Sequence, residues 1–316
     1  MTTSFLLAYF LSEQQPDGEQ VRFAVSDGPE PVRWTPLHGG RPVITSSIGE
    51  RGIRDPFLLR DEVSGRFVLI GTDLRTWPDH DWDRAVRFGS RSIVVAESSD
   101  LVRWSAPRLQ PVAPPEAGNT WAPKAFWSAE RECWLVFWAS ALFDPADETR
   151  ADGSYQRILV AETRDFRSFG ASRTHLDLGH DVIDLTFLEH AGTWYRFSAN
   201  AHARERTPEL GHHIFEERGP ALDEPEFDPF VIDIGKQAMR RAEGPAVAKS
   251  PVEDRWFLLA DEFGLRGYQL FDTDDLAGGS WRHRTDAVLP DGARHGSLLA
   301  ITDQERRRLL DAEWTP

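Results

Sequence analysis

Short apolar stretches alternate with polar turns along the whole chain. The stretches at 5–11, 66–72, 133–139 and 255–260 combine β-branched, aromatic and aliphatic residues, a composition and length typical of β-strands. Windows such as 205–217 lack the 3.6-residue period of an amphipathic helix. The pattern therefore predicts an all-β chain without a substantial helix.

One phrase of strand, turn and strand recurs. It places Ala-x-Ser/Thr at the end of an apolar stretch, followed by Asp, an apolar residue and an aromatic residue, and it is clearest at 93–104 and 158–169. Further copies lie at 21–34 and 267–281, with a weak one at 212–217. Asp suits the turn because its carboxylate accepts hydrogen bonds from nearby backbone N–H groups. The Asp residues of this phrase are therefore expected to be structural.

A second phrase precedes most of these copies: a short motif that opens a strand, then a polar turn and another strand. The motifs are Arg54-Asp55-Pro56, Trp121-Ala122-Pro123, Asp184-Leu185-Thr186, Glu243-Gly244-Pro245 and His295-Gly296-Ser297. Counted from Asp55, Trp121, Asp184, Glu243 and His295, the motifs recur at intervals of 66, 63, 59 and 52 residues. Repeats of this length, with about four strands each, predict the blades of a β-propeller.

The two ends of the chain complete the count of blades. The segment after His295 supplies one good strand, 297–302, and little else, whereas the first 45 residues supply three strands, 5–11, 20–26 and 34–44, without an opening motif. Together these four strands make one blade. We therefore predict a single domain over 1–316: a five-bladed β-propeller with about four antiparallel strands per blade, whose N-terminal strands close the last blade.

The opening motifs also indicate a site. The innermost strand of each blade lines the central axis of a propeller, so Asp55, Trp121, Asp184, Glu243 and His295 are expected at matching positions around one funnel. Carboxylates that face one another raise each other's pKa, an arrangement that acid–base chemistry uses. Hydrolysis of a glycosidic bond needs two such groups, one to activate water and one to protonate the leaving oxygen.

Composition restricts the partners. The formal net charge is −15, from 36 basic and 51 acidic residues, which opposes binding to nucleic acid and to anionic membranes. The single cysteine, Cys133, allows no internal disulfide, and no apolar run has the length of a membrane span. The first 12 residues lack the features of a signal peptide. We expect a cytoplasmic protein, or a secreted one if a leader is missing.

The five motifs together resemble glycoside hydrolase family 43, with one motif per blade in the right order. The resemblance rests on Arg54-Asp55-Pro56, Trp121-Ala122-Pro123, Ile183-Asp184, Glu243-Gly244-Pro245 and Arg294-His295-Gly296. It implies an inverting hydrolase in which Asp55 is the general base, Glu243 the general acid and Asp184 the group that raises the pKa of the acid. Inversion requires carboxyl groups roughly 6.5–9.5 Å apart.

The resemblance also implies the surroundings of the carboxylates. Arg54, Trp121, Lys124, Arg294 and His295 are expected to contact substrate, with Trp121 in the subsite wall. His295 resembles the family's axial histidine, which lies near a water-coordinated calcium or sodium ion. No cofactor is required for the chemistry itself. The expected partner is an oligosaccharide or a small glycoside.

Among the family's activities we favour an exo-acting α-L-arabinofuranosidase, with β-xylosidase and β-galactofuranosidase as alternatives. Two departures from the family pattern stand out: Lys124 follows Trp-Ala-Pro where an acidic or apolar residue is frequent, and Leu185 follows Asp184 where proline is frequent. A cation at Lys124 is expected to alter substrate contacts or the pKa of the acid.

Other patterns leave further alternatives open. Arg54-Asp55-Pro56 with Glu132-Cys133 is also similar to the fructosidase families, although no Asn-Asp-Pro motif precedes it and Glu132 lies in a polar turn. A propeller that binds sugar without catalysis is a third hypothesis. Asp228-Pro229-Phe230 copies the first motif but falls where an outer strand is expected.

Two long insertions, 75–88 and 143–155, would enforce exo action if they cover the funnel. The sequence does not decide which face they project from. Six histidines between 175 and 213 show no metal-binding spacing, and most are expected in surface or loop positions: His175, His180, His190, His202, His212 and His213. His180 is the one expected nearest the pocket, because it lies four residues before Asp184.

Overall fold

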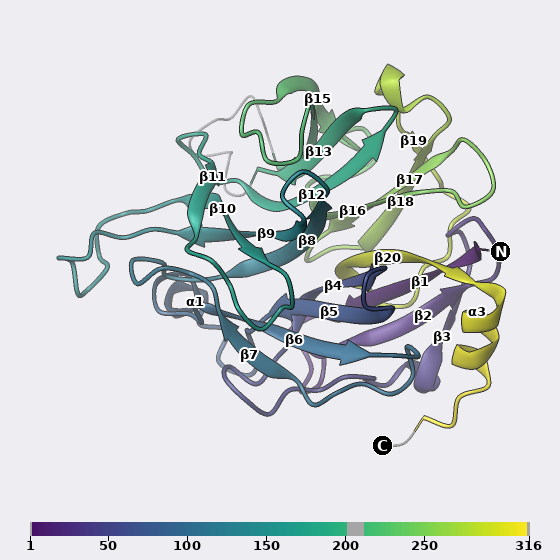
Figure 1. Ribbon diagram of the computed structural model, residues 1–316, viewed down its shortest axis with the longest axis horizontal. Helices are drawn as coiled ribbons and strands as arrows, with labels where there is room; N and C mark the ends of the chain where they lie inside the picture. Colours follow the sequence, from purple (N-terminus) through teal and green to yellow (C-terminus); the bar gives the residue numbers. More distant parts are fainter. Residues whose placement is uncertain (1, 201–211, 315–316) are drawn as a thin grey trace.

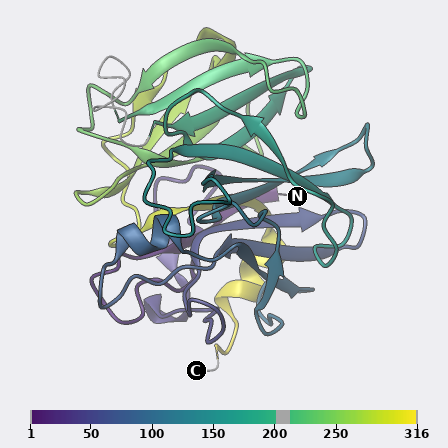
Figure 2. The same cartoon turned by 90° about the vertical axis from the view of Figure 1, so that its left-hand side faces the viewer.

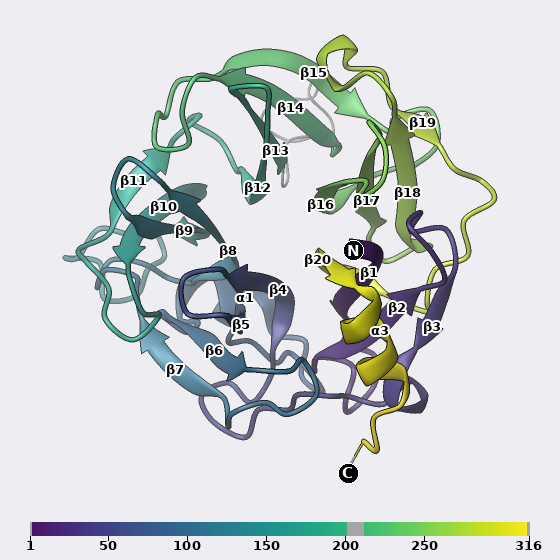
Figure 3. The same cartoon turned by 45° about the vertical axis from the view of Figure 1, so that its right-hand side comes forward.

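The computed structural model describes residues 2–200 and 212–314, and it forms five four-stranded antiparallel sheets arranged in a ring (Figure 3). Blades 1 and 2 comprise β4 Arg54–Asp61, β5 Arg66–Thr72, β6 Ser92–Ser98, β7 Arg108–Pro111, β8 Trp121–Ser128, β9 Cys133–Ala141, β10 Gln156–Thr163 and β11 Arg173–Leu176. Blades 3 and 4 comprise β12 Ile183–His190, β13 Thr193–Ala199, β14 Ile214–Gly219, β15 Asp228–Ile234, β16 Glu243–Lys249, β17 Trp256–Glu262, β18 Gly267–Thr273 and β19 Arg282–His283. The prediction of a five-bladed propeller is confirmed.

Blade 5 closes the ring, and it combines both ends of the chain as predicted. Its innermost strand, β20 Arg294–Thr302, pairs antiparallel with β1 Thr2–Phe10, which continues into β2 Arg22–Ser26 and β3 Trp34–Pro36. β20 also lies between β16 of blade 4 and β4 of blade 1. Backbone hydrogen bonds between the two ends of the chain therefore hold the whole ring shut.

Apolar side chains fill the space between neighbouring blades. Five buried clusters occur, one at each junction. At the junction of blades 2 and 3, for example, the rings of Phe137 and Phe187 lie 5.1 Å apart in a tilted arrangement. The alternation of apolar residues along each strand thus supplies two packing faces, one for each neighbouring blade.

The recurring Asp residues cap turns at the outer edges of the blades, as expected. Asp100 accepts backbone hydrogen bonds from Val102 and Arg103, and Asp165 accepts them from Arg167 and Ser168. Asp228 begins β15, the outermost strand of blade 3. Asp228-Pro229-Phe230 therefore lies away from the axis, although its sequence is similar to the first motif.

Two short α-helices lie among the described residues, which agrees with the expectation of a chain without a substantial helix. α3 Asp303–Leu310 follows β20, where little structure was expected, and α1 Trp82–Arg87 lies within the insertion at 75–88. Thr302 and Glu305 form a capping box, and Glu305 accepts a two-pronged ion pair from Arg60 at 2.7 and 3.0 Å. Helices of about two turns are too short to show a 3.6-residue period and depend on such caps and tertiary contacts.

The described residues contain no helix long and apolar enough to cross a membrane. The window 205–217 lies largely outside the described residues, and its last residues belong to β14.

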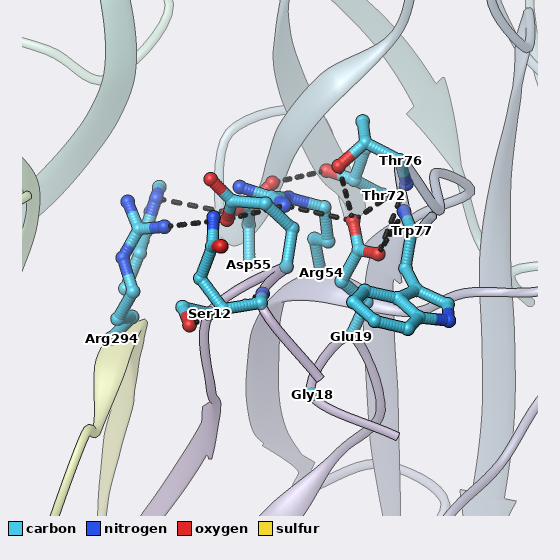
Figure 4. Close-up of polar contacts among 12 residues, drawn as sticks. Ser12, Gly18, Glu19, Arg54, Asp55, Thr72, Thr76, Trp77 and Arg294 are labelled. Carbon is cyan, nitrogen blue, oxygen red and sulfur yellow. Dashed lines mark hydrogen bonds and ion pairs between the residues drawn. The ribbon is translucent and has the colours of Figure 1, made fainter. Parts of the chain in front are cut away.

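Buried Glu19, in the loop between β1 and β2, anchors the insertion at 75–88 (Figure 4). Its carboxylate accepts hydrogen bonds from the backbone N–H of Thr76 at 2.8 and 3.0 Å and of Trp77 at 2.9 Å, and from the Thr76 hydroxyl at 3.1 Å. The guanidinium of Arg54 on β4 donates to the same carboxylate at 2.9 Å. One carboxylate thus joins the closing blade, the insertion and an innermost strand.

We expect Glu19→Ala to lower the free energy of unfolding by about 3–5 kcal/mol, because it leaves the buried guanidinium of Arg54 without its nearest counter-ion. Chemical denaturation followed by tryptophan fluorescence would measure the change. Glu62→Ala is the matched control, since Glu62 is exposed and lies 3.6 Å from Arg60, and it should cost less than about 0.5 kcal/mol. Equal stability of the two variants would contradict the anchoring role of Glu19.

Candidate active site

All five innermost strands carry the same irregularity close to their start. On β4, for example, Arg54 pairs with Thr72 and Phe57 pairs with Ile70, so that the two residues between them on β4 face one residue on β5. The same shift occurs on β8, β12, β16 and β20. This is a β-bulge, a device that changes the direction of side chains in a strand.

The second motif residue has a positive φ in four of these strands: Asp55 at 52°, Ala122 at 50°, Asp184 at 60° and Gly244 at 59°. Residues with a Cβ adopt this conformation only where the surrounding structure enforces it, often at functional sites. Asp55 and Asp184 are therefore held in a strained backbone that aims their carboxylates.

The bulge places the motif residues at two positions rather than one. Arg54, Trp121, Ile183, Glu243 and Arg294 occupy the first position of their strands. Asp55, Asp184 and His295 occupy the second. The expectation that Asp55, Trp121, Asp184, Glu243 and His295 stand at matching positions is thus wrong, because sequence spacing alone does not locate each motif relative to the bulge.

His295 joins the two aspartates of the second position. Its Nδ1 lies 3.1 Å from Oδ1 of Asp55 and 3.7 Å from Oδ2 of Asp184. Oδ2 of Asp55 accepts a hydrogen bond from the Thr72 hydroxyl at 2.7 Å, and Oδ2 of Asp184 accepts one from the backbone N–H of Gly244 at 2.9 Å. The carboxylates, contributed by blades 1 and 3, are therefore oriented by partners on blades 1, 4 and 5.

Glu243 begins a chain of alternating charges at the first position. Arg294 donates to Glu243 at 2.7 Å, to Asp261 at 2.9 Å and to Glu13 at 3.1 Å. Oε2 of Glu13 lies 3.5 Å from the Arg54 guanidinium, which in turn pairs with Glu19 (Figure 4). The arginines of the motifs therefore compensate the charges of neighbouring carboxylates, and Arg54 pairs with glutamates of the β1–β2 loop.

Burial and charge shift the three carboxylates in different directions. Burial raises the pKa of Glu243 to about 8, with Arg294 opposing the shift and Asp184, Asp261 and Asp55 adding to it. Burial also raises the pKa of Asp184, which His295 counteracts and the charge of Asp55 reinforces. Burial acts on Asp55 too, but His295, Arg54 and the Thr72 hydroxyl outweigh it and hold the pKa of Asp55 below its ordinary range. The surroundings thus favour the ionised form of Asp55 and shift Glu243 toward its protonated form.

These side chains border a cavity of about 600 Å³. Asp55, Asp184, Glu243 and His295 line it together with Arg54, Arg294 and Trp121. The Trp121 ring meets that of Trp82 edge to face, with centroids 6.3 Å apart. The cavity therefore has charged groups and two indole rings on its surface, a combination that suits a ligand with both hydroxyl groups and C–H faces.

Both insertions reach the cavity. Trp82 and Val86 of α1 line it, as does Ser154 from the insertion at 143–155. In Figure 1 α1 and the segment after β9 lie on the same side of the molecule, and Figure 2 turns that side toward the viewer. The two insertions, whose direction the sequence left open, therefore project from the face of the propeller that holds the cavity.

Lys124 lies elsewhere than expected. It is not among the described residues that line the cavity, and only 1% of the residue is exposed. Its ammonium donates to the carbonyl oxygen of Gly296 on β20 at 3.2 Å and lies 5.3 Å from the centre of the Phe57 ring. The side chain is therefore placed beneath the cavity, where direct contact with substrate is excluded.

The ion that the resemblance implies near His295 does not fit the residues present. Nε2 of His295 is buried without a hydrogen-bond partner, but the described part of the chain holds no group of three or more His, Cys, Asp or Glu side chains that could bind a metal directly, so water would have to supply most of the ligands. The ammonium of Lys124 already donates to the carbonyl of the residue after His295. A metal cation there would meet a fixed positive charge.

Several lining residues escaped the sequence analysis. Glu13 and Arg241 have no motif around them, and Gln156 and Asn200 lie at the ends of β10 and β13. His175 is buried on β11, which contradicts the expectation of a surface or loop position. His212 and His213 lie in the loop before β14, as expected, although His212 lines the cavity and His213 is buried. His180 is not among the described lining residues, and His202 lies outside the described range. An alignment of the five repeats at the end of the second strand of each blade could have identified Asn200.

Glu132 is exposed in the turn between β8 and β9, with a φ of 50°. Glu132 is not among the described residues that line the cavity. It therefore cannot serve there as the acid that the fructosidase hypothesis assigns to it.

Comparison with known proteins gives consistent results. A curated α-L-arabinofuranosidase of Bifidobacterium longum subsp. longum is 28% identical over 305 residues, which cover 87% of this chain and 28% of that protein. The chain thus spans little more than a quarter of that relative's length.

Solved structures share the fold at low identity. An α-L-arabinanase of Penicillium chrysogenum in complex with arabinobiose has a TM-score of 0.59 and 14% identity, covering 95% of this chain and 82% of that one. An endo-1,4-β-xylanase of Bacteroides thetaiotaomicron has a TM-score of 0.58 and 13% identity, covering 87% and 89%.

The family model described as "Probable glycosyl hydrolase domain", a relative of glycoside hydrolase family 43, matches residues 1–307. Almost the whole propeller, including all five opening motifs, lies within this match. The chain therefore belongs to this family of glycosyl hydrolase domains related to family 43.

Proposed function

We propose that this chain is an inverting, exo-acting glycoside hydrolase that releases a terminal furanose or pentose, in the first place α-L-arabinofuranose. The observation that carries the proposal is the pair of opposite shifts on one cavity: the pKa of Asp55 lies below its ordinary range and that of Glu243 is raised to about 8. One carboxyl group ready to accept a proton and another ready to donate one are what the hydrolysis of a glycosidic bond needs. The arabinofuranosidase of Bifidobacterium longum supports the choice of sugar.

In the proposed reaction, Asp55 is the general base and Glu243 the general acid. The Asp55 carboxylate takes a proton from a water molecule, whose oxygen forms a bond to the anomeric carbon as the bond to the leaving oxygen breaks. Glu243 donates its proton to that oxygen. Because water attacks from the face opposite to the leaving group, the released sugar has the inverted configuration. Asp184 acts on Glu243 by its charge, which keeps the acid protonated.

The cavity walls support exo action. The indole rings of Trp82 and Trp121 contact each other at the cavity, and both insertions contribute to its lining. The guanidinium of Arg54 lies 4.9 Å from the centre of the Trp82 ring and 4.7 Å from that of the Phe10 ring, and so helps to hold Trp82 in place. A cavity bordered in this way suits the end of a chain better than its middle.

We expect the wild-type protein to release a monosaccharide from one member of a panel of 4-nitrophenyl glycosides: α-L-arabinofuranoside, β-D-xyloside, β-D-galactofuranoside and fructosides. Asp55→Asn and Glu243→Gln should each lower kcat/KM roughly 10²–10⁴-fold, the contribution of general acid–base catalysis. NMR of the fresh product would give its anomeric configuration.

Asp228→Asn is the control for this test, because it alters the same Asp-Pro-Phe sequence on an outermost strand and should leave the activity unchanged. Activity that survives both carboxyl substitutions would remove Asp55 and Glu243 from these roles. A protein that binds these sugars without cleaving any of them would be a binding propeller instead.

The pH dependence should follow the protonation of Glu243. Since the acid must carry its proton, kcat/KM is retained below about pH 8 and falls as the pH rises through that value. The charge of Asp184 contributes to the raised pKa, so Asp184→Asn should move this alkaline limb to lower pH. An alkaline limb that stays in place in Asp184→Asn would contradict the proposed role of Asp184.

Trp82→Ala should raise KM roughly tenfold with a smaller change in kcat, because an aromatic contact contributes about 0.5–1.5 kcal/mol beyond its buried area. Steady-state kinetics on the best glycoside would show this. Trp127→Ala is the matched control: both residues are 38% exposed, but Trp127 packs on Trp134 and is not among the described residues that line the cavity. Equal effects of the two substitutions would argue against Trp82 as a substrate wall.

A further inference from the structure

Lys124 is a buried charged group close to the axial carboxylates that the proposed reaction does not use. Its side chain leaves β8 on blade 2, passes the Phe57 ring on blade 1 and reaches the carbonyl of Gly296 on blade 5. The contact thus spans two blade junctions and ends on the strand that closes the ring. Burying an ammonium in this way costs free energy unless nearby groups compensate the charge.

Two carboxylates provide that compensation. Burial lowers the pKa of Lys124 to about 8, while the charges of Asp55 and Asp184 oppose the shift. The influence is mutual, since the ammonium lowers the pKa of Asp184. His295 lies between the same two carboxylates. The ammonium is therefore part of the axial cluster of Asp55, Asp184 and His295, on the side away from the cavity.

We propose that the Lys124 ammonium is the built-in cation of this channel, which balances Asp55 and Asp184 in place of a metal ion. Lys124 is then a positioning residue for the hydrolase function proposed above, on which this inference rests. Its positive charge stabilises the two nearby negative charges of Asp55 and Asp184 without displacing their carboxylates. Its hydrogen bond to the Gly296 carbonyl fixes the strand that carries His295.

The donor set around His295 supports this assignment. A metal ion in the channel would need oxygen or nitrogen ligands that converge, and in the described residues no such group of acidic, histidine and cysteine side chains exists. The ammonium instead uses one carbonyl, one aromatic face and two nearby negative charges. The chain should therefore work without a divalent cation.

The first test uses the wild-type protein. After treatment with EDTA and dialysis into metal-free buffer, kcat and KM on the best glycoside should be unchanged, and millimolar Ca²⁺ should not raise the melting temperature. Loss of activity on chelation that Ca²⁺ restores, or a rise of the melting temperature with Ca²⁺, would overturn the proposal.

The second test uses variants at this position. Lys124→Met keeps the length and apolar stem but removes the charge, so kcat should fall roughly 10–100-fold, as for other outer partners of charged sites. KM should change little, because Lys124 does not reach the cavity. Lys124→Arg restores the charge and should recover much of the loss. Lys236→Met, at an exposed lysine paired with Asp233, is the control.

The Arg variant separates charge from packing. If Lys124 served only to pack the blade junction, the larger Lys124→Arg would be no better than Lys124→Met, and that result would overturn the proposal, as would full activity of Lys124→Met. If the wild-type protein cleaves no glycoside, the hydrolase function fails, and the melting-temperature measurement with Ca²⁺ still decides whether the channel holds a metal.

Discussion

Negative charges can share the buried axis of this propeller because arginine guanidinium groups and the His295 ring are placed between them. Asp55 and Asp184 meet at His295, Glu243 and Asp261 meet at Arg294, and Glu13 and Glu19 meet at Arg54. Without these partners, desolvation and mutual repulsion would protonate the carboxylates or drive the blades apart. The balance is uneven, since neighbouring groups lower the pKa of Asp55 below its ordinary range, whereas burial and nearby carboxylates raise that of Glu243.

The fold delivers this arrangement by bringing one short segment from each blade to the axis. The same bulge near the start of each innermost strand gives two successive residues access to the funnel instead of one. Closure of the ring matters for chemistry as well as stability. Arg294 and His295, the partners of all three carboxylates, lie on β20, which is held in place by its pairing with β1.

Loops and a helix outside the repeated blades form part of the wall of the cavity that Asp55, Asp184 and Glu243 line. Glu19 ties the insertion at 75–88 to the closing blade, and α1 of that insertion carries Trp82 to the cavity wall. The segment that closes the ring thus also sets the rim of the site through Glu13 and Glu19. The loop between β1 and β2 therefore joins the blade that closes the ring to the wall of the cavity.

The strand and turn pattern of the sequence was sufficient to determine five blades, the composite closing blade and the innermost strands, because these features repeat locally and each blade obeys the same alternation. It also located Asp55, Asp184, Glu243, Arg294 and His295 at one funnel. The tertiary structure alone decided that these residues occupy two positions, since a bulge depends on the partner strand and leaves no mark in spacing. It alone placed Glu13 and His212 at the cavity and Lys124 beneath it, because those contacts join side chains from segments that are far apart along the chain and have no common motif.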